Sequence, residues 1–422
     1  MKPIHYIPRR VEDYAFDETL TGRHMVFLAG PRQVGKTVLA KQWLRKRRCA
    51  PLYFNWDDIS IRQSYLADSR FFESPARSLE IQDPWIVFDE IHKRHRWRDI
   101  LKGAYDVFAD DFRFLITGSA RLDLFRRSGD SLVGRYNLFH MMPLSTGEVT
   151  QTPRGPSFLE QKDFKKQAQG LEDAFSRRLP NGTVEACEAL LQYGPFPEPF
   201  LKQKERFARK WHQDYISLVV REDLRDISRV GQLDKIENLL FLLPSRIMAP
   251  LSMPNLAGDL EVAHTTAKSW LEQLKRLYVI FSVDPWSRKI ARGLRKSKKW
   301  YFLDWYYAPK GAARLENMTA TYLYRTCLAM TDMGYGRYRL HYLRTLDKKE
   351  IDFIITRDNR PVMAVEVKSG DTGLSRSLRD RGKWFPGFPT LGVQVVDRRD
   401  VFKKFADHTW IVSIERLLSV LD

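Results

Sequence analysis

A glycine-rich loop between an apolar strand and a helix is the feature that most constrains the fold of this chain. Met25–Leu28 has the apolar run of a buried strand, and Val38–Arg47 has helical character. Between them lies the sequence GPRQVGKT, from Gly30 to Thr37. In this context the glycines let backbone N–H groups wrap phosphates, and the helix N-terminus adds a favourable dipole. The loop therefore predicts an α/β fold with a parallel sheet that binds a nucleoside triphosphate.

Two side chains of the loop carry distinct chemistry. Lys36 is expected to neutralise the β- and γ-phosphates in binding and catalysis, and the Thr37 hydroxyl is expected to ligate Mg²⁺. We expect the loop and the residue after it to contact the nucleotide: Gly30, Pro31, Arg32, Gln33, Val34, Gly35, Lys36, Thr37 and Val38.

An acidic strand end supplies the groups that hydrolysis requires. The run WIVFDE, which begins at Trp85, reads as a buried strand that ends in Asp89 and Glu90. Asp89 is expected to hold Mg²⁺, and Glu90 to polarise the attacking water as general base. Such a run is weak evidence by itself, but after a phosphate loop it indicates Mg²⁺-dependent hydrolysis.

Three further residues are candidates for sensing the γ-phosphate. Thr117 and Ser119 end the next strand, where the alternative is an ordinary turn from strand to loop. Arg135 is a candidate for an arginine that reaches the γ-phosphate in cis or from a neighbouring subunit of a homo-oligomer, and the alternative is a surface ion pair. The chain has no Asn-Lys-x-Asp segment for reading guanine, which favours ATP.

Four segments together resemble a known family: GPRQVGKT, WIVFDEIHK, FLITGSARL and SLVGRYNLFHMMPLSTGE. The chain resembles the AAA+-type ATPases of bacteria and archaea that carry a C-terminal domain of unknown function. The resemblance covers nearly the whole chain. It implies a core with the acidic strand beside the phosphate-loop strand, although not in sequence order.

The charge balance favours a polyanionic partner. Lysine and arginine total 70 against 52 acids, a formal net charge of +18, which favours nucleic acid or an acidic membrane surface, with solubility as the alternative. The three cysteines are too far apart for a disulfide framework. Because the sequence has neither a signal peptide nor an apolar run of membrane-spanning length, we expect a cytoplasmic protein without membrane contact.

Shifts in pattern along the chain predict three domains. The expected organisation is an ATPase domain at 1–150, a linker or insertion at 151–182, a helical region at 183–300 and a nuclease-like domain at 301–422. Within the helical region we expect a winged helix at about 233–285 and a basic loop at 286–300.

The winged-helix prediction rests on a helix, turn, helix and strand in succession. Leu256–Leu260 and Thr265–Leu277 read as the two helices, and Tyr278–Val283 reads as the strand. The second helix would read DNA, whereas the alternative is a structural lid or a protein interface. The DNA contacts predicted on its exposed face are Lys268, Lys275 and Arg276.

A basic run follows this segment. It would attract the phosphate backbone without reading sequence, and the alternative is a solvated loop. After the strand that ends at Asp304, relatives usually have a small residue and glycine, whereas this chain has Trp-Tyr-Tyr, which leaves the role of Asp304 open. The predicted phosphate contacts in the run are Arg288, Lys289, Arg292, Arg295, Lys296, Lys298 and Lys299.

The C-terminal part contains two carboxylates and a lysine on neighbouring strands. Glu366 and Lys368 are two residues apart on one strand, and a hairpin would bring Asp352 near them. Such a cluster can bind Mg²⁺ or Mn²⁺ and activate water, and it resembles the PD-(D/E)xK nuclease core. Glu316, on a preceding helix, would be a further metal ligand with Asp352 and Glu366. Gln394 is a weaker candidate, with an exposed strand residue as the simpler reading.

Two hypotheses about function follow. In the first, the chain is an ATP-driven enzyme that acts on DNA and carries a metal-dependent nuclease site. In the second, nucleotide switches a scaffold that grips DNA or a protein, and the nuclease-like domain is catalytically inert. Membrane binding through the basic run ranks last, because no apolar amphipathic face accompanies it.

Overall fold

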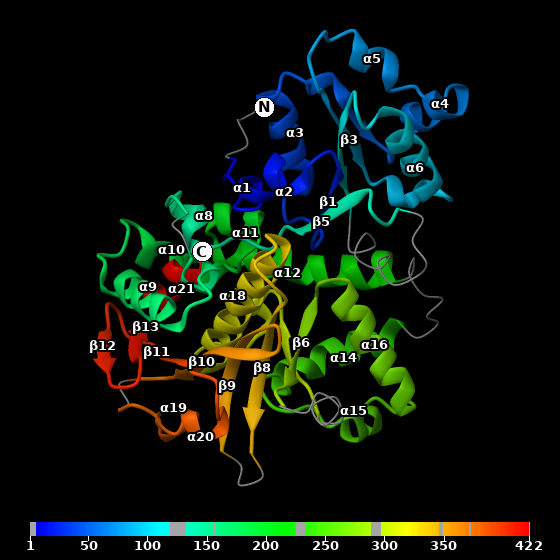
Figure 1. The fold of residues 1–422 in the computed structure, drawn as a ribbon. Helices are drawn as coiled ribbons and strands as arrows, with labels where there is room; N and C mark the ends of the chain where they lie inside the picture. Colours follow the sequence, from blue (N-terminus) through cyan, green and yellow to red (C-terminus); the bar gives the residue numbers. More distant parts are fainter. Residues whose placement is uncertain are drawn as a thin grey trace. The chain divides into compact units, whose positions relative to one another are not determined.

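The computed structural model describes residues 6–118, 132–154, 157–224, 233–287, 297–345, 349–370 and 373–421. The chain divides into two compact units, Met1–Met142 and Pro143–Asp422 (Figure 1). The first is built on a parallel sheet, and the second combines helices with a mixed sheet. The predicted fold class, a parallel-sheet α/β domain followed by helical and α/β parts, is confirmed.

The sheet of the first unit has five parallel strands in the order β2-β3-β4-β1-β5. Strands β1, β3 and β4 are buried along their whole length, as expected for strands covered on both faces. The strands are β1 (Met25–Ala29), β2 (Tyr53–Asn55), β3 (Trp85–Asp89), β4 (Arg113–Thr117) and β5 (Tyr136–His140).

One feature of this order corrects the sequence-based expectation. The resemblance implied that the acidic strand lies beside the phosphate-loop strand, which is wrong, because β4 lies between β3 and β1. Ile116 of β4 pairs with Phe88 on one side and with Phe27 on the other. The expectation that the strands are out of sequence order is confirmed. The intervening strand brings Thr117, its last residue, to the same edge as the phosphate loop.

Helix α3 (Lys36–Lys46) follows the phosphate loop and packs against β3 and β4. Its buried residues Leu39, Ala40, Trp43 and Leu44 recur every three to four positions, which aligns them on one helix face. The other helices of the unit are α1 (Glu12–Ala15), α2 (Glu18–Thr21), η1 (Ala50–Leu52), α4 (Ile59–Ala67), α5 (Glu73–Arg77), η2 (Ile91–Lys93) and α6 (Trp97–Phe108).

The second unit contains an eight-stranded sheet in the order β12-β13-β11-β10-β9-β8-β6-β7, most of whose strands are labelled in Figure 1. The antiparallel β6–β7 hairpin joins this sheet through pairing of Asp284 with His341. A domain boundary at residue 300 would therefore cut through β7. The strands are β6 (Ile280–Pro285), β7 (Lys299–Phe302), β8 (Tyr338–Arg344), β9 (Glu350–Arg357), β10 (Arg360–Lys368), β11 (Leu391–Val396), β12 (Phe402–Phe405) and β13 (Thr409–Ser413).

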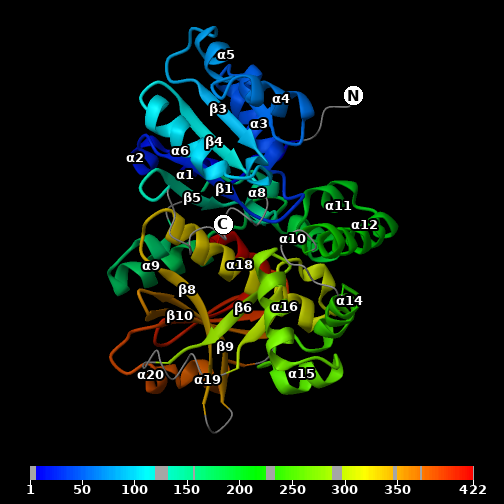
Figure 2. The same ribbon diagram turned by 90° about the vertical axis from the view of Figure 1, so that its right-hand side faces the viewer.

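Helix α18 (Ala312–Asp332) packs against β7, β8, β9 and β10 and is the longest described helix of this unit (Figure 2). The remaining helices are α8 (Thr146–Thr150), η4 (Phe158–Glu160), α9 (Phe164–Ser176), α10 (Thr183–Tyr193), α11 (Pro197–Lys202), α12 (Glu205–Leu218), η5 (Val219–Leu224), α14 (Leu233–Leu242), η6 (Leu243–Ser245), α15 (Met253–Asp259), α16 (His264–Arg276), η7 (Trp305–Tyr307), α19 (Arg376–Arg379), α20 (Arg381–Trp384) and α21 (Ile414–Leu421).

The stretch 151–182, for which the sequence predicted a linker or insertion, contains the packed helix α9. Its Phe175 ring lies 6.1 Å from the Trp410 ring of β13, centroid to centroid. Arg416 of α21 donates a hydrogen bond to the Phe175 carbonyl at 2.6 Å. This part of the stretch therefore belongs to the core of the second unit.

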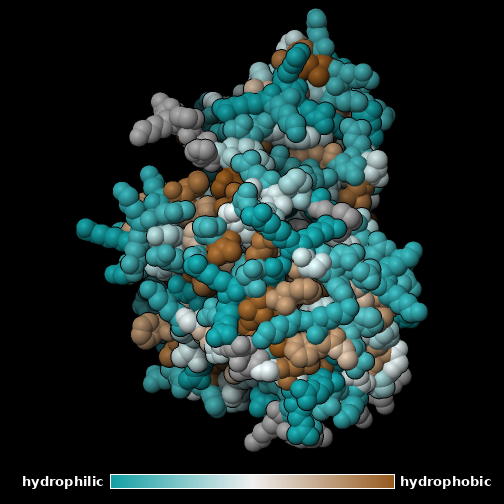
Figure 3. Space-filling model, turned by 90° about the vertical axis from the view of Figure 1, so that its left-hand side faces the viewer, coloured by the Kyte–Doolittle hydropathy of each residue, from teal (hydrophilic) through white to brown (hydrophobic). Residues whose placement is uncertain are grey.

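Hydrophilic side chains predominate on the face drawn in Figure 3, and apolar side chains form separate clusters there. None of the described helices is both long enough and apolar enough to span a bilayer.

Candidate functional site

The backbone of the phosphate loop depends on two glycines. Gly30 has φ +154°, and a Cβ there would lie 2.2 Å from the carbonyl oxygen of Met141, which follows β5. Gly35 has φ +105° and is the N-cap residue of α3. Side chains rarely tolerate such φ values, so both positions require glycine. The loop thus has the backbone path that phosphate binding needs.

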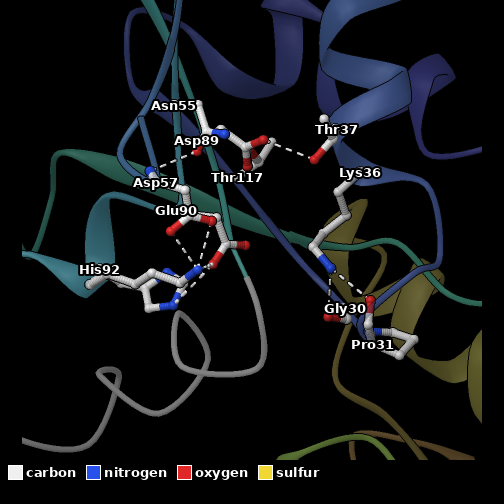
Figure 4. A network of polar contacts seen from close by, with 11 residues as sticks. Gly30, Pro31, Lys36, Thr37, Asn55, Asp57, Asp89, Glu90, His92 and Thr117 are labelled. Atoms are coloured by element: carbon white, nitrogen blue, oxygen red, sulfur yellow. Dashed lines mark hydrogen bonds and ion pairs between the residues drawn. The ribbon is translucent and has the colours of Figure 1, made fainter. Parts of the chain in front are cut away.

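Lys36 folds back over this loop (Figure 4). Its ammonium donates hydrogen bonds to the carbonyl oxygens of Gly30 at 2.9 Å and Pro31 at 2.7 Å, and the residue is buried. Because a phosphate oxygen is a stronger acceptor than a carbonyl, the ammonium can exchange these partners for a bound triphosphate. Its position agrees with the predicted role in phosphate neutralisation.

Asp89 accepts hydrogen bonds from three hydroxyl groups at the carboxyl edge of the sheet, and Figure 4 labels two of the donors, Thr37 and Thr117. Thr37 donates to Oδ2 at 2.8 Å, Tyr53 donates to the same oxygen at 2.5 Å, and Thr117 donates to Oδ1. Thr37 and Asp89, the two predicted Mg²⁺ ligands, are therefore in direct contact. Carboxylate and hydroxyl oxygens are ligands that Mg²⁺ prefers.

Thr117 lies in this network rather than on the surface. It is fully buried, and its backbone carbonyl accepts a hydrogen bond from Glu90 N at 2.9 Å. Its hydroxyl thus orients Asp89, while the predicted contact with the γ-phosphate stays a prediction. Ser119, the alternative sensor, lies outside the described residues. Tyr53 was missed, because no local pattern reveals that β2 lies beside β3.

Glu90 leaves β3 with φ +58°. Its carboxylate lies 3.4 Å from the Lys93 ammonium and 3.6 Å from His92 Nε2, and Lys93 also pairs with Asp57 at 2.7 Å (Figure 4). Burial raises the pKa of Glu90 above its ordinary value, and the charge of Lys93 partly offsets this rise. A carboxylate of raised basicity beside the phosphate loop suits a general base.

Arg135 lies at the opposite end of the sheet from the phosphate loop. Its carbonyl accepts a hydrogen bond from Met25 N at 2.9 Å, at the start of β1, whereas Gly30 follows the end of β1. The five residues of β1, which separate these two positions, span roughly 16 Å along the strand. The side chain pairs with Asp106 at 2.6 Å. A cis contact between Arg135 and the γ-phosphate is therefore wrong, while a contact in trans stays a prediction.

A further residue near the loop was missed by the sequence. Arg9 is buried and donates from Nη1 to the carbonyl oxygen of Val34 at 2.7 Å and from Nη2 to that of Met142. It therefore ties the phosphate loop to the segment that follows β5. No motif distinguishes Arg9 from other basic residues near the N-terminus.

The predicted C-terminal cluster is assembled on α18, β9 and β10. Phe353 pairs with Val365, which places Asp352 and Glu366 on adjacent strands, and Glu366 pairs with Gln394 of β11. Lys368 Nζ lies 3.4 Å from Glu366 Oε2. The Asp352 carboxylate accepts a hydrogen bond from Val367 N at 2.9 Å. The hairpin thus brings together the residues that the sequence singled out.

Burial dominates the electrostatics of this cluster. It raises the pKa of Glu316 to about 7, with a further rise from the charge of Asp352 and an opposing effect of Lys299. Burial likewise raises the pKa of Asp352, against the charge of Lys299. It also raises the pKa of Glu366, against a hydrogen bond with Ser375 and the charge of Lys368. Such carboxylates gain free energy from a nearby cation.

The cluster has the donor types for a divalent cation, but it is not a preassembled metal site. Within the part of the chain that the structure describes, Glu366 Oε2 is buried and has no hydrogen-bond partner, and the Lys368 ammonium lies 3.4 Å from it. Yet among the described residues no three Asp, Glu, His or Cys side chains converge closely enough to hold an ion. The carboxylates would have to move to bind Mg²⁺ or Mn²⁺, so the predicted ligand set of Glu316, Asp352 and Glu366 stays a proposal.

The helices of the winged-helix prediction lie close to their expected positions. α15 and α16 precede the β6–β7 hairpin, and α16 buries Ala267, Trp270, Leu271 and Leu274, as expected. Of the predicted DNA contacts on α16, Lys268 and Arg276 are exposed. Lys275 is half-buried and donates to the hydroxyl of Ser282 at 2.8 Å.

The basic run is described only at its end. Lys298 is half-buried and lies 3.3 Å from Asp284. Lys299 is buried and pairs with Glu350, so its predicted contact with nucleic acid is wrong. Because β7 pairs in the sheet, the Lys299 side chain points into the protein interior. The other predicted contacts lie outside the described residues: Arg288, Lys289, Arg292, Arg295 and Lys296.

Asp304, whose role the sequence left open, has a structural role. Its Oδ1 accepts a hydrogen bond from Tyr306 N at 3.0 Å, and its Oδ2 lies 2.9 Å from Nδ1 of the buried His212. The Tyr306 ring stacks on His212 with centroids 3.8 Å apart. The aromatic residues that replace the usual small residue and glycine therefore pack around this pair.

Comparison with protein families finds a match in the first part of the chain. Residues 22–150 match the family model described as AAA domain. This match, together with the phosphate loop, supports an AAA-type P-loop ATPase domain in this segment. Residues 184–305 match a domain of unknown function (DUF8612), and residues 315–417 match another (DUF4143). These two matches assign no activity to the second unit.

Relatives with a similar sequence are themselves uncharacterised. A protein of Mycobacterium tuberculosis is 24% identical over 371 residues, which cover 84% of this chain and 73% of the relative. A protein of Methanocaldococcus jannaschii is 23% identical over 382 residues, covering 85% and 78%.

Two solved structures are distantly similar. One is the Aeropyrum pernix ORC1 protein in complex with DNA, with 14% identity, a TM-score of 0.30 and coverage of 67% of this chain and 84% of that one. The other is Cdc6p of Pyrobaculum aerophilum, with 14% identity, a TM-score of 0.24 and coverage of 68% and 90%.

Proposed function

We propose that this protein binds and hydrolyses ATP with Mg²⁺ and uses the nucleotide state to control its action on DNA. The observation that carries the ATPase part is the contact of Thr37 with Asp89 at 2.8 Å, next to Lys36 and Glu90. These four side chains supply a magnesium site, a phosphate counter-charge and a base. The absence of an Asn-Lys-x-Asp segment supports ATP over GTP.

Hydrolysis requires that each of these residues act on a different atom. Lys36 would neutralise charge on the β- and γ-phosphate oxygens, and Thr37 and Asp89 would hold Mg²⁺. Glu90 would accept the proton of the attacking water. Arg135 can contribute only if a neighbouring copy of the chain brings it to the γ-phosphate.

The ATPase part is tested by measuring ATP binding and phosphate release. Lys36→Ala is expected to lose binding, because the buried ammonium is the phosphate counter-charge. If Lys36→Ala binds ATP as well as the wild type does, the proposed site is wrong.

The DNA part rests on charge and on the region around α16. Lys268 and Arg276 lie exposed on one helix, and the chain carries a net charge of +18. Such a surface binds the phosphate backbone, with an affinity that falls as salt concentration rises. The alternative is a nucleotide-dependent switch that grips a protein. It would be favoured if this chain bound DNA less tightly than serum albumin, the negative control, binds it.

We propose as a second activity that the C-terminal cluster cleaves phosphodiester bonds with Mg²⁺ or Mn²⁺. The observation that favours it is the placement of Asp352 beside Glu366, with Lys368 3.4 Å from Glu366. In this role Asp352 and Glu366 would hold the cation, with Glu316 as a further ligand, and Lys368 would orient the attacking water or the scissile phosphate.

Cleavage of plasmid and oligonucleotide DNA, with and without ATP, tests this activity. Wild-type cleavage that disappears in Asp352→Ala and Lys368→Ala is expected. Equal activity in wild type and both variants would reject the nuclease site. Nucleotide-dependent DNA binding without cleavage under either metal would favour an inert nuclease-like domain.

A further inference from the structure

Lys299 is a lysine whose burial the proposed functions do not explain. Its side chain is 1% exposed, although it ends the basic run of the sequence. The ammonium forms an ion pair with Glu350 of β9 and lies 5.3 Å from the centre of the Tyr342 ring. A lysine is almost never fully buried unless its charge is paired. The carboxyl groups that pair with the Lys299 charge therefore indicate its role.

The side chains around Lys299 belong to the acidic cluster. Glu350 is two residues from Asp352 on β9, so both lie on one face of that strand. Tyr301, two residues after Lys299 on β7, donates a hydrogen bond to Glu316 at 2.9 Å. The Lys299 charge acts on Glu316 and Asp352 as well as on Glu350. Strand β7 thus directs a cation and a hydroxyl donor at the carboxylates of α18 and β9.

The cluster holds more carboxyl groups than cations, and the cations differ in burial. Four carboxyl groups face the ammonium groups of Lys299 and Lys368 and the guanidinium of Arg344, which lies 3.8 Å from Glu350. The side chains of Lys368 and Arg344 are 41% and 42% exposed. Lys299 is therefore the buried one of these three cations. Solvent screens its charge less than that of Lys368, so its repulsion of a second cation is stronger. The carboxyl groups are Glu316, Glu350, Asp352 and Glu366.

We propose that Lys299 is the internal counter-cation of this cluster and keeps its affinity for divalent cations low. Lys299 neutralises carboxylates that would otherwise ligate a metal, and it holds Glu350 in an ion pair. The inference explains why the described carboxylates do not converge on a metal position. It rests on the proposed second activity, in that the cluster must be able to take a divalent cation. Lys299 is a positioning residue, since it acts through the carboxylates.

Mn²⁺ binding, followed by electron paramagnetic resonance of the free ion, tests this inference in nucleotide-free protein. Asp89→Asn is included in every sample, so that the ATPase site does not contribute. Lys299→Met is expected to bind Mn²⁺ at least tenfold more tightly than the parent protein does. Adding Asp352→Asn should abolish the gain. The matched control is Lys404→Met, which removes an ion-paired lysine from β12 of the same sheet and should change nothing.

Two further variants guard against a folding defect. Lys299→Arg keeps the charge and should retain the low affinity of the parent. Glu350→Gln removes the ion-pair partner of Lys299, so that the Lys299 ammonium acts on Glu316 and Asp352 instead and Mn²⁺ binding should weaken. Folding of each variant is checked by circular dichroism and thermal unfolding.

The outcomes separate the inference from the proposed activity. Suppose that the parent protein binds Mn²⁺ well and that Lys299→Met folds but binds it no more tightly. Lys299 is then not the counter-cation, and the metal site stands. If neither protein binds Mn²⁺ at millimolar concentration, both the metal site and the inference are wrong. Unchanged binding in Glu350→Gln would also overturn the inference.

Discussion

The carbonyl oxygen of Met141 faces Gly30 so closely that a Cβ at position 30 would lie 2.2 Å from it. Met141 N also donates to the carbonyl of Ala29 at 2.8 Å, so the backbone after β5 runs directly beside the start of the phosphate loop. The loop therefore takes its shape from a strand more than a hundred residues away as well as from its own sequence.

Gly30→Ala is expected to abolish ATP binding, because the added methyl group must displace either the loop or the Met141 backbone. Isothermal titration calorimetry with ATP and Mg²⁺ measures the loss. Gly103→Ala is the matched control, since a Cβ there meets open space on helix α6. That control should bind ATP normally and gain up to about 1 kcal/mol of stability from helix propensity. Normal ATP binding by Gly30→Ala would show that the loop tolerates a different path.

Glu90→Gln is expected to bind ATP and to lose hydrolysis by about 100-fold or more, because the amide cannot accept the proton of water. Single-turnover phosphate release measures this. The pH dependence gives a second readout, because hydrolysis needs ionised Glu90. The rate should rise with pH through the raised pKa of this carboxyl group. Lys93→Met removes the charge that lowers this pKa and should move the rise to higher pH. An unmoved pH profile would exclude Glu90 as the base.

Glu316 makes the stability of the second unit depend on pH. Its folded-state pKa of about 7 lies above its ordinary value of 4.5, so the folded protein binds this proton more tightly than the unfolded chain does. The resulting stabilisation is complete below the ordinary value and is lost as pH rises through about 7. Differential scanning calorimetry between pH 5 and 8.5, with chelator present, should show that the unfolding temperature of the wild type declines as pH rises. In Glu316→Gln this decline should be smaller by roughly 3–8 °C.

The control for this measurement is Glu188→Gln, which changes a side chain that is 52% exposed and should keep the wild-type profile. Parallel profiles for wild type and Glu316→Gln would mean that the buried carboxyl group does not titrate in this range.

Lys268 and Arg276 are expected to contribute to DNA binding through the phosphate backbone. Changing both to glutamate should weaken binding of every duplex sequence to a similar degree. It should also reduce the slope of log affinity against log salt by about 1 per residue. Fluorescence anisotropy at several salt concentrations measures both effects. Lys404→Glu is the control on another surface, and an equal loss in that variant would show that only net charge matters.

The elements that the sequence predicted correctly are those with a local signal. The apolar run before Gly30, the acidic end of β3 and the helical spacing of Trp270, Leu271 and Leu274 each specify an element from neighbouring residues alone. Hairpin proximity also sufficed to bring Asp352 to Glu366, because only a short turn separates β9 from β10.

The features that escaped prediction depend on pairing between distant segments. The position of β4 between β3 and β1, and hence the role of Thr117 beside Asp89, follows from strand order, which local patterns do not encode. Lys298 and Lys299 are neighbours in one basic run, yet only Lys299 is fully buried, because β7 joins the sheet that carries Glu350. The register of β5 likewise places Arg135 at the far edge from the phosphate loop, which excludes the cis contact that its sequence position allowed.

The central claim is that ATP bound at the phosphate loop controls DNA binding by the same chain. The most direct test is the affinity of Glu90→Gln protein for a labelled duplex, measured with and without ATP and Mg²⁺. We predict at least a tenfold change in the dissociation constant on adding ATP, and no change when Lys36→Ala is also present. An identical dissociation constant in both conditions, with ATP binding verified on the same protein, would contradict the claim.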